Sequence, residues 1–173
     1  MRESSRALVV GGLLTGLMLA FFLFMAMPTV TGEEIRLPLQ AVDPFDPLRG
    51  QSLTLSYAIN NPAALPGLPT SLQEHQAVYV LLEESTTGLA VPVQASTSVL
   101  RAGKGQRLLR GHVDRGRIAY GIEALFIGRG AAPETSLAGA VARVQLHPDG
   151  SASVLGLLKD GKPIALRSRN RSL

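Results

Sequence analysis

Residues 141–158 read VARVQLHPDGSASVLGLL, and this stretch decides the fold class. Two apolar segments flank the tetrapeptide His147-Pro148-Asp149-Gly150. Asp-Gly between such segments is among the strongest short-range signals of a β-hairpin, because glycine accepts the positive φ that a tight turn requires. The sequence therefore predicts two antiparallel strands, residues 141–146 and 151–158, joined by a turn at residues 147–150.

Strand-like patterns extend to both sides of this hairpin. Residues 51–59 alternate between apolar and polar side chains most regularly, as in a strand with one buried face. Residues 76–83 are β-rich without alternation, which is typical of a central strand. Pro38 places residues 33–40 at a sheet edge, because proline lacks a ladder donor. The other predicted elements are a turn at 84–88, a strand at 89–94, irregular chain at 96–105, a hairpin of 107–113 and 117–122, a loop at 128–133, and one or two helical turns at 134–139.

The fold class that follows is mainly β. Many short strands with turns between them, and almost no helical periodicity in this region, favour an antiparallel sheet curled into a small β-barrel or a β-sandwich. Both architectures remain open at this point.

Residues 7–27, ALVVGGLLTGLMLAFFLFMAM, are an uncharged apolar run. At about 1.5 Å per residue, a helix of this length crosses the ~30 Å hydrocarbon layer of a bilayer. The run is longer than the apolar region of a usual signal peptide, so we expect an uncleaved transmembrane anchor. A small-residue site at Val30-Thr31-Gly32 keeps cleavage open as the alternative.

The charges that flank the run predict its orientation. Arg2 and Arg6 precede it, Glu33 and Glu34 follow it, and positive flanks stay cytoplasmic. We expect a single-pass protein of the bacterial inner membrane with its N-terminus inside and its C-terminal region outside the cytoplasm. The predicted divisions are a cytoplasmic N-terminus at 1–6, the anchor at 7–27, a β-rich extracytoplasmic domain at 28–166 and a basic flexible tail at 167–173.

Gly12 and Gly16 form a G-x-x-x-G within the apolar run. This spacing allows a second helix to approach closely in lipid, so a helix-mediated oligomer is one expectation. The alternative is that glycine is simply common in spanning helices.

Composition excludes several classes of site. The chain contains no cysteine, which rules out disulfides, thiolate metal ligands and a cysteine nucleophile. His75, His112 and His147 stand far apart without the spacing of a zinc site, so we predict neither a metal nor a cofactor. The net charge of +4 is mildly basic. The six basic residues of the 101–117 region have no interleaved aromatic residues, so nucleic acid is not an expected partner, whereas anionic lipid is.

One octapeptide, Gly50-Gln51-Ser52-Leu53-Thr54-Leu55-Ser56-Tyr57, resembles the motif of the bacterial GDYxxLxY family. Gly50, Leu55 and Tyr57 match the motif, whereas Gln51 and Ser52 replace its Asp and first Tyr. Further segments that are similar to family landmarks follow the same order: residues 43–49, 120–123 and 160–163. With the apolar run, the resemblance spans most of the chain, and it implies a membrane-anchored protein that accompanies a multi-spanning membrane protein, without an accepted catalytic mechanism.

The first functional hypothesis is therefore a non-catalytic interaction module. Rigid Asp-Pro turns beside a regular strand favour a fixed polar-aromatic surface that binds an integral membrane partner. No catalytic residue is assigned. The candidate partner-binding residues are Asp43, Asp46, Arg49, Gly50, Tyr57, Tyr120 and Glu123.

Two rival hypotheses remain. An envelope hydrolase would use Ser52 with Asp43 and Glu123 near the same motif, but the lysines that might activate a serine lie in turns where they stay protonated. The second rival is a barrel that binds a small lipid.

Overall fold

The computed structural model describes residues 11–22, 25, 32–40, 52–126, 131–133, 136–164 and 166–168. The chain divides into two compact units, Met1–Gly32 and Glu33–Leu173. The residues predicted to form the Asp-Pro turns, Asp43 to Gly50, fall outside the described residues. So do the ends of the apolar run of residues 7–27.

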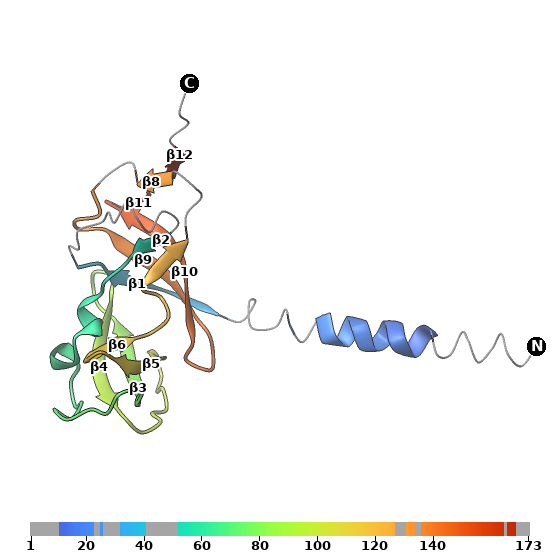
Figure 1. Cartoon of the computed structure of the whole chain (residues 1–173), viewed down its shortest axis with the longest axis horizontal. Coiled ribbons are helices and arrows are strands. Elements are labelled where there is room, and N and C mark those ends of the chain that lie inside the picture. The colour runs from blue at the N-terminus through green and yellow to red at the C-terminus, as the bar shows by residue number, and fades with distance from the viewer. Residues whose placement is uncertain are drawn as a thin grey trace, which may run out of the picture. The chain divides into compact units, whose positions relative to one another are not determined.

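The first unit contains a helix over residues 11–22, and Met25 is also helical (Figure 1). Thr15 is accommodated in this apolar helix because its Oγ1 donates to the carbonyl oxygen of Gly11 at 2.9 Å. Along the described residues, no helix combines the length and apolar character needed to cross a membrane.

The second unit is mainly β, and its strands curl into a half-barrel (Figure 1). One four-stranded sheet has the order β1-β9-β10-β11, and every pairing in it is antiparallel. Its strands are β1 (Glu33–Pro38), β9 (Val141–Leu146), β10 (Ala152–Lys159) and β11 (Lys162–Pro163).

The central hairpin of this sheet confirms the prediction from residues 141–158. His147 N donates to Ser151 O at 2.9 Å, which closes the turn, and Gly150 has the positive φ of 82° that this turn requires. Strand β1 pairs with β9 alone among the described strands, which confirms the predicted edge strand, although β1 ends at Pro38 and not at residue 40.

The second four-stranded sheet has the order β4-β3-β5-β6, also antiparallel. Strand β3 lies between β4 and β5, as predicted for a central strand. The hairpin predicted around residues 114–116 forms, with Asp114 paired to Arg117, although β6 ends at Ala119 instead of Ile122. The strands are β3 (Ala77–Glu84), β4 (Ala90–Ser96), β5 (Gln106–Asp114) and β6 (Arg117–Ala119).

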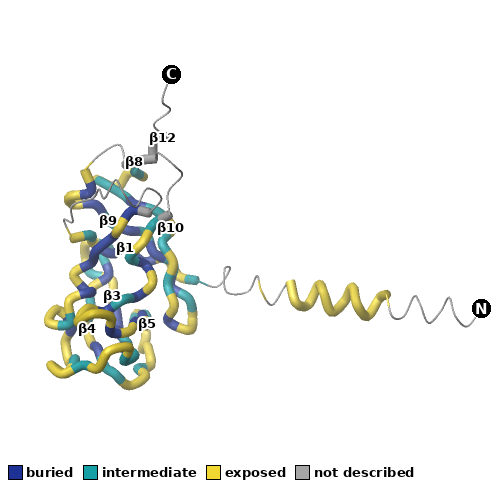
Figure 2. The backbone as a smooth tube through the Cα atoms, viewed as in Figure 1, coloured by how far each residue is buried: buried dark blue, intermediate teal, exposed yellow. Residues whose placement is uncertain are grey.

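Both sheets enclose one hydrophobic core (Figure 2). Val78, Val80 and Leu109 come from the second sheet and Ala142 and Val144 from the first, and all five are fully buried. The backbone also joins the sheets, because Arg110 N donates to Gly150 O at 2.8 Å at the tip of the β9–β10 hairpin. The sheets therefore behave as parts of one domain.

Four sequence predictions need correction. The strand predicted over residues 51–59 is β2 (Ser52–Thr54), and the chain then turns through two 3₁₀-helices, η1 (Ala58–Asn60) and η2 (Pro62–Ala64). The reason is local: the Asn60 side chain accepts a hydrogen bond from Tyr57 N at 2.7 Å, which competes with a sheet ladder.

The other corrections concern the C-terminal third. Residues 131–133 form strand β8 (Ala131–Pro133) instead of loop, because they pair with β12 (Leu166–Ser168). Arg167 and Ser168 therefore lie in a strand and not in a tail. Residues 136–139 form a turn rather than helix, with Ala140 N bonded to Leu137 O. Strand β7 (Ala124–Phe126), which pairs with β2, was not predicted.

Candidate functional site

Three of the seven predicted partner-binding residues come together in the structure. Tyr57, Tyr120 and Glu123 lie where η1 meets the chain between β6 and β7, linked by the hydrogen bonds given below. Asp43, Asp46, Arg49 and Gly50 lie outside the described residues.

Backbone pairing positions the two segments that carry these residues. Tyr57 forms an isolated antiparallel bridge with Leu39, directly after β1. Leu55 N donates to Glu123 O at 2.7 Å, in line with the pairing of β2 and β7. The turn before η1 and the turn before β7 are therefore held side by side by main-chain bonds.

The carboxylate of Glu123 accepts three hydrogen bonds at this site. Its Oε1 accepts from Tyr120 N at 2.7 Å and from Asn60 Nδ2 at 3.0 Å, and its Oε2 accepts from Gly121 N at 2.9 Å. Two of these donors belong to the turn that precedes Glu123, and the third belongs to η1. The carboxylate thus closes its own turn and joins it to the other segment.

Both tyrosines are buried and bonded to the opposite segment. Tyr57 Oη donates to Ile122 O at 2.9 Å, and Tyr120 Oη donates to Ile59 O at 2.8 Å. Burial, and to a smaller degree the charge of Glu123, raises the pKa of each phenol above its ordinary value. The phenols therefore stay protonated and act as hydrogen-bond donors that fasten the two segments together.

Asn60 completes the arrangement, although the sequence analysis did not select it. Only 2 % of its surface is exposed, and its Nδ2 donates to Ile118 O at 2.7 Å as well as to Glu123. The signal available in the sequence was Asn60-Asn61-Pro62 at the end of a strand-like run, a pattern typical of a side chain that bonds its own turn. Tyr57, Asn60, Tyr120 and Glu123 are called the tyrosine–glutamate cluster below.

The chemistry of the tyrosine–glutamate cluster is that of a rigid scaffold. Its phenols, its amide and both carboxylate oxygens are engaged with backbone or with each other, and a protonated buried phenol is no general base. Tyr57 and Tyr120 are 1 % and 5 % exposed, so both side chains lie beneath the surface.

The described residues of the rival hydrolase hypothesis do not form a catalytic arrangement through any hydrogen bond between them. Ser52 lies in β2, Glu123 is held as above, and Asp43 is outside the described residues. Lys159 Nζ donates to the carbonyl oxygen of Ser136 at 2.8 Å and not to a hydroxyl. In the ranges that the structure describes, no three His, Asp or Glu side chains gather as metal ligands would.

Three of the six basic residues of the 101–117 region have side-chain partners within the domain. Arg107 is bonded to Glu33 at 2.6 Å, and Arg117 Nη2 donates to Ser56 Oγ at 2.8 Å. Arg115 lies 4.0 Å from Asp114. Two of these partners are acidic residues and the third is a serine hydroxyl.

Comparisons with known proteins give one match. A family model described as GDYXXLXY protein matches residues 14–157, which is more than half of the chain. No curated protein matches the chain. No solved structure matches it either.

Proposed function

The chain belongs to the GDYXXLXY protein family, and from this premise we propose that it is a membrane-anchored, non-catalytic interaction module. Residues 7–27 form a transmembrane helix, and the domain of residues 28–166, an antiparallel barrel or sandwich, lies outside the cytoplasm. The domain binds an integral protein of the bacterial inner membrane.

The apolar helix supports the membrane part of the proposal. Its large apolar side chains are 60–76 % exposed: Leu13, Leu14, Leu17, Met18, Leu19, Phe21, Phe22 and Met25. A helix that exposes apolar side chains on all its faces is unfavourable in water and favourable in lipid. Around Gly12 and Gly16, an added Cβ would meet nothing within 4 Å, and self-association through these glycines stays a prediction.

One observation carries the interaction part of the proposal: the residues that flank the Asp-Pro segment, residues 41–51, are bonded to the two chain segments that carry the tyrosine–glutamate cluster. Gln40 N donates to Ser56 O at 2.8 Å, beside Tyr57. At the other end, Ser52 pairs with Phe126 in the β2–β7 ladder that begins just after Glu123. The described residues on either side of 41–51, Gln40 and Ser52, are therefore both fixed by main-chain pairing, which favours a binding role for Asp43, Asp46 and Arg49.

The proposed topology makes a direct prediction. A cysteine introduced as Arg171→Cys in this cysteine-free chain is expected to react with a membrane-impermeant maleimide in intact spheroplasts. Ser4→Cys, on the other side of the anchor, is expected to react only after the membrane is permeabilised. Labelling of Ser4→Cys but not of Arg171→Cys in intact spheroplasts contradicts the orientation.

A second prediction concerns partner binding. Asp46 and Arg49 are the charged residues on either side of Pro47-Leu48 in the Asp-Pro segment. The double substitution Asp46→Ala/Arg49→Ala is therefore expected to lower recovery of a crosslinked membrane protein at least about tenfold, as loss of a central charged contact does. Recovery is measured by photo-crosslinking in intact cells, followed by mass spectrometry of the adduct.

The matched control for this experiment is Asp160→Ala/Lys162→Ala, which removes the same pair of charges from the exposed β10–β11 turn. Equal recovery in both double variants, with unchanged circular dichroism, rules out the Asp-Pro segment as the binding surface.

A further inference from the structure

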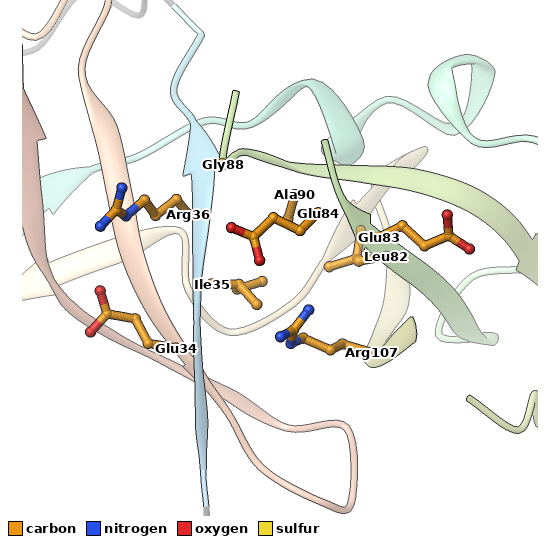
Figure 3. A pocket seen from close by; sticks show the side chains of 9 residues that line it. All are labelled: Glu34, Ile35, Arg36, Leu82, Glu83, Glu84, Gly88, Ala90 and Arg107. Carbon is orange, nitrogen blue, oxygen red and sulfur yellow. The ribbon is translucent and has the colours of Figure 1, made fainter. Parts of the chain in front are cut away.

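A cavity of about 260 Å³ opens between the two four-stranded sheets (Figure 3). Its walls come from β1, from the end of β3, from the start of β4 and from β5. It exists because β1 pairs only with β9 and β4 only with β3 among the described strands, so no ladder closes the gap between these two edges. This space is called the seam cavity.

The floor of the seam cavity is apolar. Ile35, Leu82 and Ala90 line it, and they are 5 %, 1 % and 7 % exposed. All three belong to the hydrophobic core, so their positions are fixed by packing. A short apolar group bound in the cavity would pack against these three side chains.

Several of the charged residues around the cavity are engaged away from it. Glu34 forms a two-point contact with Arg143 at 2.8 and 2.7 Å, and Glu83 accepts from Gln106 Nε2 at 2.8 Å. In Figure 3, both of these glutamates point away from the space around Ile35.

Two groups of opposite charge point into that space, the Glu84 carboxylate and the Arg107 guanidinium (Figure 3). Arg107 uses its Nε for Glu33, at 2.6 Å, so both Nη groups keep their donors for another acceptor. The Glu84 carboxylate has no hydrogen bond or ion pair within the part of the chain that the structure describes. Glu84 can therefore bind a cationic group and Arg107 an anionic group, both above the same apolar floor.

We propose that the seam cavity binds a free α-amino acid with an aliphatic side chain. Its carboxylate lies on the Nη groups of Arg107, its ammonium group on Glu84, and its side chain on Ile35, Leu82 and Ala90. Guanidinium recognises a carboxylate through two parallel hydrogen bonds, which gives this pose its direction. The volume is just below the ~300–1,000 Å³ of sites for drug-sized ligands, which suits a molecule of this size.

The test uses the full chain in detergent micelles, with methyl-labelled isoleucine and leucine observed by NMR. L-leucine is added to about 10 mM, which is tenfold above the ~1 mM range of weak binding. We expect saturable shifts at the methyl groups of Ile35 and Leu82, and none at Leu155, which lines a separate groove on β10. Leucinamide lacks the carboxylate and 4-methylpentanoate lacks the ammonium group, and each is expected to bind at least tenfold more weakly.

Three variants test which charged side chains of the protein bind leucine. Arg107→Gln and Glu84→Gln are each expected to weaken leucine binding at least tenfold. Glu33→Gln breaks the same ion pair as Arg107→Gln but leaves the guanidinium in place, so it is expected to bind leucine as the parent does. The proposal is overturned by an absence of shifts at Ile35 and Leu82, by binding of either analogue as tightly as L-leucine, or by equal affinities in Arg107→Gln and Glu33→Gln.

Discussion

Replacing Glu123 with alanine is expected to lower the free energy of unfolding by about 3 kcal/mol. The substitution removes the acceptor of three donors: the backbone N–H groups of Tyr120 and Gly121 and the Nδ2 group of Asn60. A hydrogen bond to a charged group contributes about 1.5–3 kcal/mol, and a buried donor without a partner carries a further cost. Gly121 is exposed and water replaces its bond, which keeps the sum well below three times that value.

The measurement is urea denaturation of the full chain in a mild detergent, followed by far-UV circular dichroism. Glu74→Ala is the matched control, because Glu74 also accepts a backbone N–H, that of Arg115 at 2.9 Å, but at an exposed position. We expect this control to change the free energy by less than about 0.5 kcal/mol. A loss below about 1 kcal/mol in Glu123→Ala contradicts a central role for the carboxylate.

This result would also separate stability from partner binding. Glu123 is a candidate partner-binding residue in the sequence, but both of its carboxylate oxygens already accept hydrogen bonds within the structure. If Glu123→Ala lowers recovery of the crosslinked partner, the cause is therefore a displaced turn. If Asp46→Ala/Arg49→Ala lowers recovery without changing the free energy of unfolding, the cause is a lost contact with the partner.

The hairpins were predictable because the signal for each is local. Asp149-Gly150 and Arg115-Gly116 each occupy a few consecutive residues, and positive φ values at Arg115 and Gly116, 50° and 74°, confirm that the turn chemistry determines the structure there. The central position of β3 was likewise visible in its run of apolar residues.

Pairings between distant segments were not predictable in the same way. Strand β7 contributes three residues, and its partner β2 lies some seventy positions earlier, as the pairing of Ser52 with Phe126 shows. Three-residue strands carry too little periodicity to be recognised. The end of the 51–59 run was misjudged for another reason, since one amide side chain, that of Asn60, redirects the backbone.

The candidate site was likewise predictable in part. The family resemblance selected Tyr57, Tyr120 and Glu123, and the structure joins them, with both tyrosines buried and the Glu123 carboxylate half-buried. The seam cavity had no sequence signal, because Ile35, Glu84 and Arg107 come from three strands whose edges meet only in the fold.

Substituting Gly111 with alanine is expected to cost about 3 kcal/mol, for a reason that β-propensity alone does not supply. A Cβ at this position in β5 would lie 2.7 Å from Tyr120 Cδ1, 2.8 Å from Ala119 O and 2.9 Å from Ile118 Cγ2. Overpacking of a core typically costs about 1–3 kcal/mol. Here the upper end applies, because Tyr120 is tied to Ile59 O at 2.8 Å and its ring cannot move away without losing that bond.

Urea denaturation measures this loss, and Gly156→Ala provides the control. Gly156 also lies in a strand, but a Cβ there would meet nothing within 4 Å, so a change within about 0.5 kcal/mol is expected. The mechanism can be isolated with a double-mutant cycle, since Tyr120→Phe removes the bond that restrains the ring. If the restrained ring is the cause, Gly111→Ala costs at least about 0.5 kcal/mol less in the Tyr120→Phe background than in the parent. Strict additivity of the two substitutions would place the strain instead on Ala119 O and Ile118 Cγ2. If Gly111→Ala loses no more stability than Gly156→Ala, the close contact does not exist.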